Sequence, residues 1–200
     1  TGTNYTSDLT LGVTYDTRND VLSASRGMFT HGQTDFASSR LGGTNDFVRV
    51  EFDWRGYTSV RRGRVASIQL RLGWLKPQGD SSDVPVNERF LAGGEGSVRG
   101  FPRNSLGPAD ADGVPTGGRA LLIGRAEFRF PVYKKLRAAV FADAGQVYEE
   151  LGDIRPYRLA VGAGGGLRYE TRIGVLRVDV ATPVSERGQP QYYFGIGQAF

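Results

Sequence analysis

The side chains that most often carry out catalysis are scarce in this chain. His31 is the only histidine and has no recognisable motif around it, and cysteine is absent. Hydrolases that work through a histidine need it beside a serine or an aspartate in a recognisable motif, so no hydrolase site can be built around His31. Gly94, Gly96 and Gly100 lack the GxGxxG spacing of a nucleotide-binding loop. These observations predict a protein that is not an enzyme and that needs no cofactor.

The most distinctive chemistry lies in a polar segment, 88–108, which reads ERFLAGGEGSVRGFPRNSLGP. It contains Arg99 together with Val98 and Phe101, apolar residues for which a solvated loop has little use. A buried guanidinium needs carboxylates that offset its loss of water, ideally through charge-assisted hydrogen bonds. Gly100 would permit a tight turn after Arg99, and Phe101 would pack the tip against a wall. We therefore expect this loop to fold back inside a barrel.

The remainder of the chain is predicted to form that barrel. Apolar and polar residues alternate in segments of about 8 to 13 residues separated by Gly, Pro, Asn and Asp, and helical periodicity is nearly absent. The pattern predicts strands at 9–16, 27–37, 47–57, 63–75, 119–130, 136–147, 158–170, 174–182 and 191–200. The segments share one pattern, so residues 1–200 are expected to belong to a single all-β domain with an inward-folded loop at 76–118.

The two faces of each strand decide between a soluble and a transmembrane barrel. In the segment 47–57, Val48, Val50, Phe52 and Trp54 alternate with Arg49, Glu51, Asp53 and Arg55. A soluble sandwich with its apolar face inward is the alternative interpretation. A transmembrane antiparallel barrel is favoured by charged faces that carry both signs, by links that tend to alternate between short and long, and by aromatic residues near strand ends. Carboxylates on different strands could hold a divalent ion, but barrel interiors are commonly polar in this way, so no metal is predicted.

Composition excludes several other classes of protein. The longest apolar runs span about five residues, against the roughly 20 of a membrane-spanning helix. The 25 basic and 21 acidic residues are interleaved along the strands, so no nucleic acid is expected as a partner despite the net charge of +4. Short links interpreted as periplasmic turns place the C-terminus on the periplasmic side, and nine strands then place the N-terminus outside. We therefore expect further strands, and an export signal, upstream of Thr1.

Several segments resemble the barrel of the bacterial outer-membrane insertase superfamily, which includes BamA, TamA and the two-partner-secretion transporters. The matching segments are RFLAGGEGSVRGF at 89–101, LGP at 106–108, GRAEFRFP at 124–131, FADAGQVY at 141–148, GAGGGLRYETRIGVLRVDVATP at 162–183 and YYFGIGQAF at 192–200. They occur in the order and spacing of the family. The resemblance implies nine strands at the C-terminal end of a barrel of sixteen, with periplasmic POTRA domains upstream. The short loop and its wording are closer to TamA than to BamA.

The resemblance also implies roles for particular residues. In the VRGF motif, Arg99 would pair with Asp143 and with Glu127 and fasten the loop inside the barrel, and such a lock could also serve stability alone. The last strand resembles an outer-membrane β-signal, with Tyr192, Phe194, Gly195, Ile196, Gly197 and Phe200 as its seam residues. Its glycines would weaken the pairing with the first strand of a complete barrel, and an edge that opens can template another strand.

These implications lead to one expected function and two alternatives. The expected function is a TamA-like factor of the bacterial outer membrane that inserts unfolded client proteins into the lipid bilayer by opening its seam. The resemblance also implies a TamB-like protein as its periplasmic partner. The first alternative is a two-partner-secretion transporter that passes an unfolded polypeptide through the lumen. The second alternative is a passive pore.

Overall fold

A computed structural model describes residues 5–79, 81, 83–172 and 174–200. Nine strands form one antiparallel sheet, and each strand pairs with the next along the chain. The strands are β1 (Asp8–Asp16), β2 (Gly27–Ala37), β3 (Phe47–Arg61), β4 (Arg64–Pro77), β5 (Ala120–Tyr133), β6 (Leu136–Tyr148), β7 (Ala160–Thr171), β8 (Gly174–Pro183) and β9 (Gln191–Ile196). This architecture confirms the predicted all-β antiparallel fold class.

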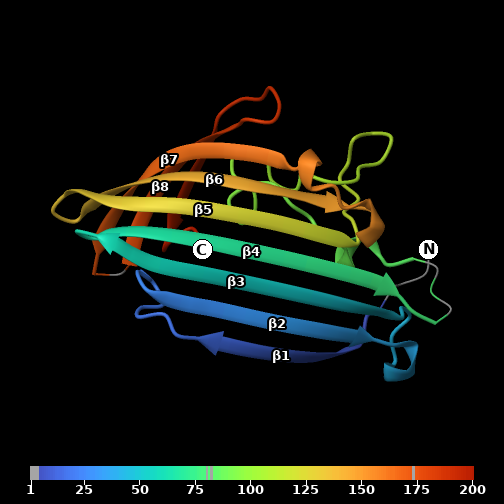
Figure 1. Cartoon of the computed structure of the whole chain (residues 1–200). Helices are drawn as coiled ribbons and strands as arrows, with labels where there is room; N and C mark the ends of the chain where they lie inside the picture. Colours follow the sequence, from blue (N-terminus) through green and yellow to red (C-terminus); the bar gives the residue numbers. More distant parts are fainter. Residues whose placement is uncertain (1–4, 80, 82, 173) are drawn as a thin grey trace.

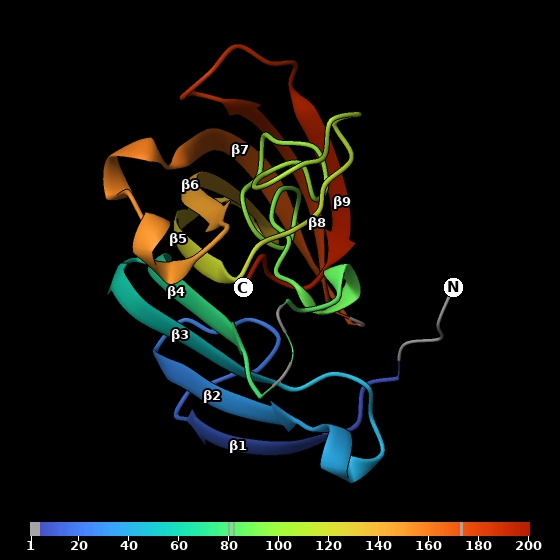
Figure 2. The ribbon, with the colours of Figure 1, turned by 90° about the vertical axis from the view of Figure 1, so that its right-hand side faces the viewer.

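The sheet is curved, and its concave side holds the long segment between β4 and β5 (Figures 1 and 2). Residues 78–119 make up that segment, close to the predicted loop at 76–118. The links at 62–63 and 134–135 are short and lie at the same end of the sheet (Figure 1). Four short 3-10 helices lie in the longer links: η1 (Ser39–Leu41), η2 (Val86–Glu88), η3 (Leu151–Asp153) and η4 (Pro156–Arg158). Among the described residues, no helix is long and apolar enough to span a membrane.

The two faces of the strands differ as the alternation predicted. On β5, Arg125, Glu127 and Arg129 are buried on the concave side, while Ala126 between them is exposed on the convex side. Apolar side chains on the convex face are open, including Val140 at 50% exposure and Val178 at 45%. The charged side chains lie on the concave face and the apolar side chains on the convex face. A convex face of this kind suits contact with lipid better than contact with water, as in a transmembrane barrel.

The structure moves the ends of several predicted strands. β3 and β5 continue to Arg61 and Tyr133, past the predicted ends at 57 and 130. Two other strands are shorter than predicted. The predicted strand 158–170 begins only at Ala160, because Pro156 fixes the backbone of η4 and Arg158 belongs to that helix. The predicted strand 191–200 ends at Ile196. Gly197 has a φ of 99°, a left-handed conformation that cannot continue a strand, and the last residues leave the sheet there.

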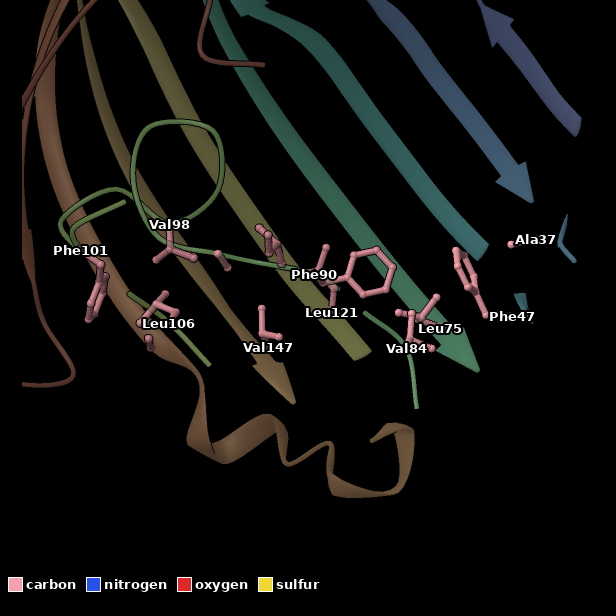
Figure 3. Packing of buried hydrophobic residues seen from close by; sticks show 13 residues of the cluster. Ala37, Phe47, Leu75, Val84, Phe90, Val98, Phe101, Leu106, Leu121 and Val147 are labelled. Atoms are coloured by element: carbon pink, nitrogen blue, oxygen red, sulfur yellow. The ribbon is translucent and has the colours of Figure 1, made fainter. Parts of the chain in front are cut away.

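The hydrophobic core lies between the inward loop and the wall of the sheet (Figure 3). Phe90 of the loop packs beside Leu121 of β5 and Leu75 of β4, and the ring of Phe90 lies so close to Gly73 that a Cβ there would overlap it. Further along the loop, Val98, Phe101 and Leu106 join the same cluster together with Val147 of β6. Apolar contacts therefore hold the loop along most of its length and bring Arg99 to a fixed place on the wall.

Candidate functional site

The inward loop has a defined backbone. Phe90 and Gly118 form a pair of backbone hydrogen bonds, and Ala92 pairs with Leu106, so the two arms of the loop run side by side. The tip between them carries Arg99. Gly100 follows with a φ of 98°, and a Cβ there would lie 2.8 Å from the backbone carbon of Thr182 on β8. Only glycine fits this turn, because both its conformation and its space exclude a side chain.

Arg99 is fully buried and forms a bidentate ion pair with Asp143 of β6. Its Nε lies 2.6 Å from Asp143 Oδ2, and its Nη2 lies 2.9 Å from Asp143 Oδ1. The backbone N–H of Arg99 also donates to Asp143 Oδ2, at 3.1 Å. Three charge-assisted hydrogen bonds therefore connect the loop tip to one carboxylate, which fixes both the side chain and the backbone of Arg99.

Two further carboxylates and two further arginines complete the arrangement. Arg99 Nη1 donates to Glu127 of β5 at 3.0 Å and lies 3.4 Å from Asp179 of β8. Arg168 of β7 bonds the same two carboxylates, with its Nη2 3.1 Å from Glu127 Oε2. Arg125 of β5 lies 3.5 Å from Asp143. We call these six residues, Arg99, Arg125, Arg168, Glu127, Asp143 and Asp179, the Arg99 cluster.

The carboxylates of the Arg99 cluster face an excess of positive charge, because the buried Arg129 and Arg177 also lie 3.8 Å from Glu127 and 3.7 Å from Asp179. Within the cluster itself, three guanidinium groups face three carboxylates, and all six side chains are nearly or fully buried. Burial disfavours the charged form of Arg99, yet its hydrogen bonds with Asp143 and its interactions with Glu127 raise the pKa of the guanidinium above its ordinary value. The ring of Phe141 lies 3.4 Å beneath the guanidinium carbon and adds a cation–π contact. Arg99 therefore remains charged at every physiological pH.

Glycines of β7 provide the space for the Arg99 cluster. Gly162, Gly164 and Gly166 face the concave side, where a Cβ at Gly162 would overlap the carbonyl oxygen of Arg99. A Cβ at Gly164 would lie 2.7 Å from the ring of Phe141, and one at Gly166 would lie 2.8 Å from Arg168 Nη1. The glycine-rich sequence of β7 thus forms a flat wall against which the loop tip lies.

Strand β9 is the last strand of the sheet and, among the described residues, pairs with β8 alone. Tyr192, Phe194 and Ile196 point to the convex side and are each about two-thirds exposed or more. Tyr193 points inward, where its hydroxyl accepts from the N–H of Gly100 at 2.9 Å and donates to the carbonyl of Phe101 at 3.3 Å. One tyrosine thus connects the edge strand to the loop tip.

The structure corrects the seam assignment at two residues. Gly197 and Phe200 were expected within the last strand, but they lie beyond its end at Ile196. The chain turns into the concave side at Gly197, where Arg125 Nη1 donates to the carbonyl of Ala199 and the guanidinium lies 4.9 Å from the ring centre of Phe200. The physical reason is the left-handed backbone at Gly197, together with the buried charge of Arg125, which attracts a carbonyl and an aromatic face.

Sequence reasoning placed Arg99, Glu127 and Asp143 near one another but missed three partners. Arg168 and Asp179 lay on the charged faces of their strands, yet only the structure shows that Asp179 contacts Arg99 and that Arg168 binds the same carboxylates, Glu127 and Asp179. The inward parity of Tyr193 was the one signal that could have identified it.

No group of residues that could hold a metal ion occurs in the part of the chain that the structure describes. A polar cavity of about 580 Å³ lies between β2–β4, the loop and the chain end, with His31, Glu51 and Arg71 in its lining.

Comparisons with known proteins point in one direction. A family model, the Omp85 superfamily domain, matches residues 1–200. The outer membrane protein assembly factor BamA of Nitratidesulfovibrio vulgaris is 26% identical over 100% of this chain and 26% of its own length. The BamA of Neorickettsia risticii is 34% identical over 73% of this chain and 21% of its own. The sorting and assembly machinery component 50 homolog of Bos taurus is 30% identical over 66% of this chain and 27% of its own length.

A solved structure shows the same fold. The crystal structure of BamA from Haemophilus ducreyi, lacking POTRA domains 1–3, superposes with a TM-score of 0.78 at 22% identity. The match covers 94% of this chain and 40% of that one. The chain thus spans about a quarter of the length of the curated relatives that it matches.

Proposed function

Because the chain belongs to the Omp85 superfamily, we propose that it forms part of a protein that inserts unfolded client proteins into the lipid bilayer of the outer membrane. It is an outer-membrane protein, and it is not an enzyme: its curated relatives are named for protein assembly. In this proposal the chain is the C-terminal portion of a barrel of sixteen strands, with the remaining strands and POTRA domains upstream.

The observation that supports the proposal is the contrast between the firmly fastened loop and the weakly fastened last strand. The Arg99 cluster ties the loop tip to β5, β6, β7 and β8, which makes that part of the wall rigid. Among the described residues, β9 pairs with β8, and Tyr193 connects it to the loop tip. In a complete barrel the other edge of β9 would meet the first strand, and opening of that seam would offer backbone donors and acceptors to a client strand, which could add to β9 by β-augmentation. The seam residues Tyr192, Phe194, Gly195 and Ile196 would meet that client.

A cycle of neutral substitutions in the full-length protein tests the role of the loop: Arg99→Gln, Asp143→Asn and the double variant. Charge reversal suits this site poorly, because an arginine at 143 would face Arg125. We expect each single variant to fold, as heat-modifiable gel mobility reports, and to lose assembly of a client barrel. The double variant should be no worse than the poorer single variant, because both changes remove one contact.

Asp53 and Arg55 provide the matched control pair. They form a half-buried ion pair on the concave face of β3, on the other side of the polar cavity from the loop tip. Their neutral variants should keep both folding and client assembly. If the variants at 99 and 143 assemble clients as well as the parent does, the loop has no functional role. If assembly falls only as much as the folded fraction falls, the Arg99 cluster has a structural role alone.

A narrower assignment is a TamA-like factor with a TamB-like periplasmic partner. It is supported by the short loop and by the sequence RFLAGGEGSVRG at 89–100. Co-purification of the full-length protein from native membranes should then recover a TamB-like protein. Recovery of outer-membrane lipoproteins of a BamA complex in its place would contradict this narrower assignment and leave the broader one intact.

The polar cavity favours a second candidate function, the passage of an unfolded polypeptide through the lumen. In that case the loop is a movable plug, and deletion of 89–108 should increase ion conductance in planar bilayers and the secretion of a dedicated substrate. A passive pore differs from both functions, since it conducts ions with the loop in place and has no effect on the assembly of other barrels.

A further inference from the structure

An apolar groove crosses the convex face of the sheet near its short turns. It has a volume of about 470 Å³ and is lined by Thr17, Gly27, Met28, Trp54, Gly56, Tyr57, Thr58, Ala66 and Ile68. In the register of the sheet, Met28, Gly56 and Ile68 stand side by side on β2, β3 and β4. A Cβ at Gly56 would lie 2.8 Å from the indole of Trp54, so the indole rests over a strand position that has no side chain.

A basic turn lies directly beyond the groove. The groove ends at the pair Thr58 and Ala66, and the strands close three residues further on, where Arg61 pairs with Arg64. At about 3.3 Å per residue, the turn is roughly 10 Å from the end of the groove. Arg61, Arg62 and Arg64 are all exposed, and no acidic residue occurs between 57 and 66. We call residues 61–64 the arginine turn.

The neighbouring turn strengthens the positive charge. Lys134 and Lys135 are exposed between β5 and β6, and residues 131–137 contain no acidic residue. Arg137 Nη1 donates to the carbonyl of Gly63 at 2.9 Å, so the two turns are in contact. The opposite end of the sheet has a different character, because its loops carry exposed carboxylates, among them Glu149, Glu150 and Asp153.

We propose that the groove and the arginine turn bind an anionic phospholipid from the leaflet that the short turns face. An acyl chain lies in the groove against Trp54, and the phosphate meets Arg61, Arg62 and Arg64. The proposal rests on the membrane location of the proposed function. Apolar surface and positive charge follow one another along the strands in the order in which a phospholipid presents its chains and its headgroup. Arginine suits this position, because its guanidinium binds phosphate oxygens through paired hydrogen bonds while its stem stays in apolar surroundings.

Tryptophan fluorescence can test this proposal, because the chain has only Trp54 and Trp74. The full-length protein is prepared with either Trp54 or Trp74 as its single tryptophan and reconstituted in phosphatidylcholine vesicles. Acyl-brominated phosphatidylglycerol or acyl-brominated phosphatidylcholine then serves as the quencher. We expect phosphatidylglycerol to quench Trp54 half-maximally at a mole fraction at least about fivefold lower, the preference that a single basic residue provides at an anionic surface. Trp74, toward the other end of β4, should show no preference.

Matched variants separate the groove and the turn from general charge. Replacement of all three arginines of the turn by glutamine should abolish the preference at Trp54. The same loss of charge at the opposite end, through Arg40→Gln, Arg158→Gln and Arg187→Gln, should leave it unchanged. Ala66→Leu, at the end of the groove on β4, fills the groove without a new Cβ against Trp54 and should weaken the preference. Gly32→Leu is the control, because Gly32 lies at another convex position and nothing lies within 4 Å of a Cβ there; this variant should not weaken the preference.

Three results would overturn the proposal. Equal quenching of Trp54 by the two lipids, or a preference that survives the loss of the arginine turn, would show that no anionic lipid is selected. Capture of a protein and of no phospholipid by a photo-crosslinking residue at Ile68 in cells would make the groove a protein contact. Failure of both brominated lipids to quench Trp54 would show that this face does not contact the bilayer, and it would contradict the membrane location. Only this last result also counts against the proposed function.

Discussion

At the scale of single residues, the Arg99 cluster illustrates how a buried charge is made tolerable. Each carboxylate faces at least two guanidinium groups: Asp143 faces Arg99 and Arg125, and Asp179 faces Arg99 and Arg168. Such a network contributes little to stability compared with apolar packing, but the removal of one member leaves its partners unpaired in a medium that solvates them poorly. Its value lies in specifying one position for the loop tip.

Asp179→Asn is therefore expected to be costly. Loss of this carboxylate leaves Arg168 with Glu127 as its remaining acidic partner, and the expected loss of unfolding free energy is about 3–5 kcal/mol. Urea unfolding of the full-length protein in lipid or detergent measures it. Asp53→Asn removes a half-buried carboxylate from a wet pair and should cost less than about 1 kcal/mol. Equal effects of the two substitutions would show that the cluster is solvated.

At the scale of elements, the loop and three strands fit together by shape. The backbone of the loop tip touches β7 at Gly162, β8 at Thr182 and β9 at Tyr193. These contacts involve backbone atoms, so they depend on small residues and on one hydroxyl rather than on side-chain size. The fit predicts that small additions to β7 displace the loop.

Gly162→Ala should move the loop tip off the wall. Its Cβ would overlap the carbonyl oxygen of Arg99, and overpacking of this kind costs about 1–3 kcal/mol. Hydrogen exchange at residues 97–102 should become faster in the full-length protein. Gly124→Ala on β5, where nothing lies within 4 Å of the new Cβ, is the control. Unchanged exchange at 97–102 in Gly162→Ala would contradict the close approach of the loop.

Tyr193→Phe should loosen the connection between β9 and the loop. The substitution leaves the N–H of Gly100 without its acceptor, a loss of about 1–3 kcal/mol for a buried donor. Trypsin should then cleave after Arg103, which is exposed beside the tip, faster than in the parent. Tyr192→Phe changes the adjacent tyrosine on the convex face and should leave the cleavage rate unchanged. Identical cleavage rates for the two variants would show that Tyr193 does not hold the loop tip to β9.

At the scale of the whole molecule, the curved sheet sorts charge from apolar surface. Its convex face is apolar over the middle of the strands, and its concave face holds the loop, the ion network and a polar cavity. This is the reverse of a soluble barrel, and it predicts that the penalty for a charge on the convex face depends on its depth in the bilayer.

Val178→Lys tests this depth dependence. Val178 stands near the middle of β8 on the convex face, and a lysine there should cost about 2–4 kcal/mol in a bilayer. Val184, one residue past the end of β8 and also exposed, should tolerate lysine at a cost of about 0–1 kcal/mol. Equilibrium folding of the full-length protein into vesicles measures both values. Equal penalties would place this face outside the hydrocarbon region.

The sequence by itself determined the strands, their faces and the inward loop. Alternation has a period of two residues, so it is visible without any knowledge of neighbours, as in Arg125, Glu127 and Arg129 of β5. The link lengths and the glycine-rich sequence of β7 could also be identified from the sequence, because turns and close backbone approaches require particular residues locally. Family resemblance added the expected pairing of Arg99 with Glu127 and Asp143.

Only the tertiary structure decided which charges meet and where the last strand ends. Arg168 and Asp179 join the Arg99 cluster through the register of β7 and β8, and register depends on the partner strand rather than on either sequence alone. The end of β9 at Ile196 follows from the backbone at Gly197 and from the lumenal position of Arg125, which attracts the residues after it. The apolar groove beside the arginine turn has the same origin, because it forms only when β2, β3 and β4 lie side by side.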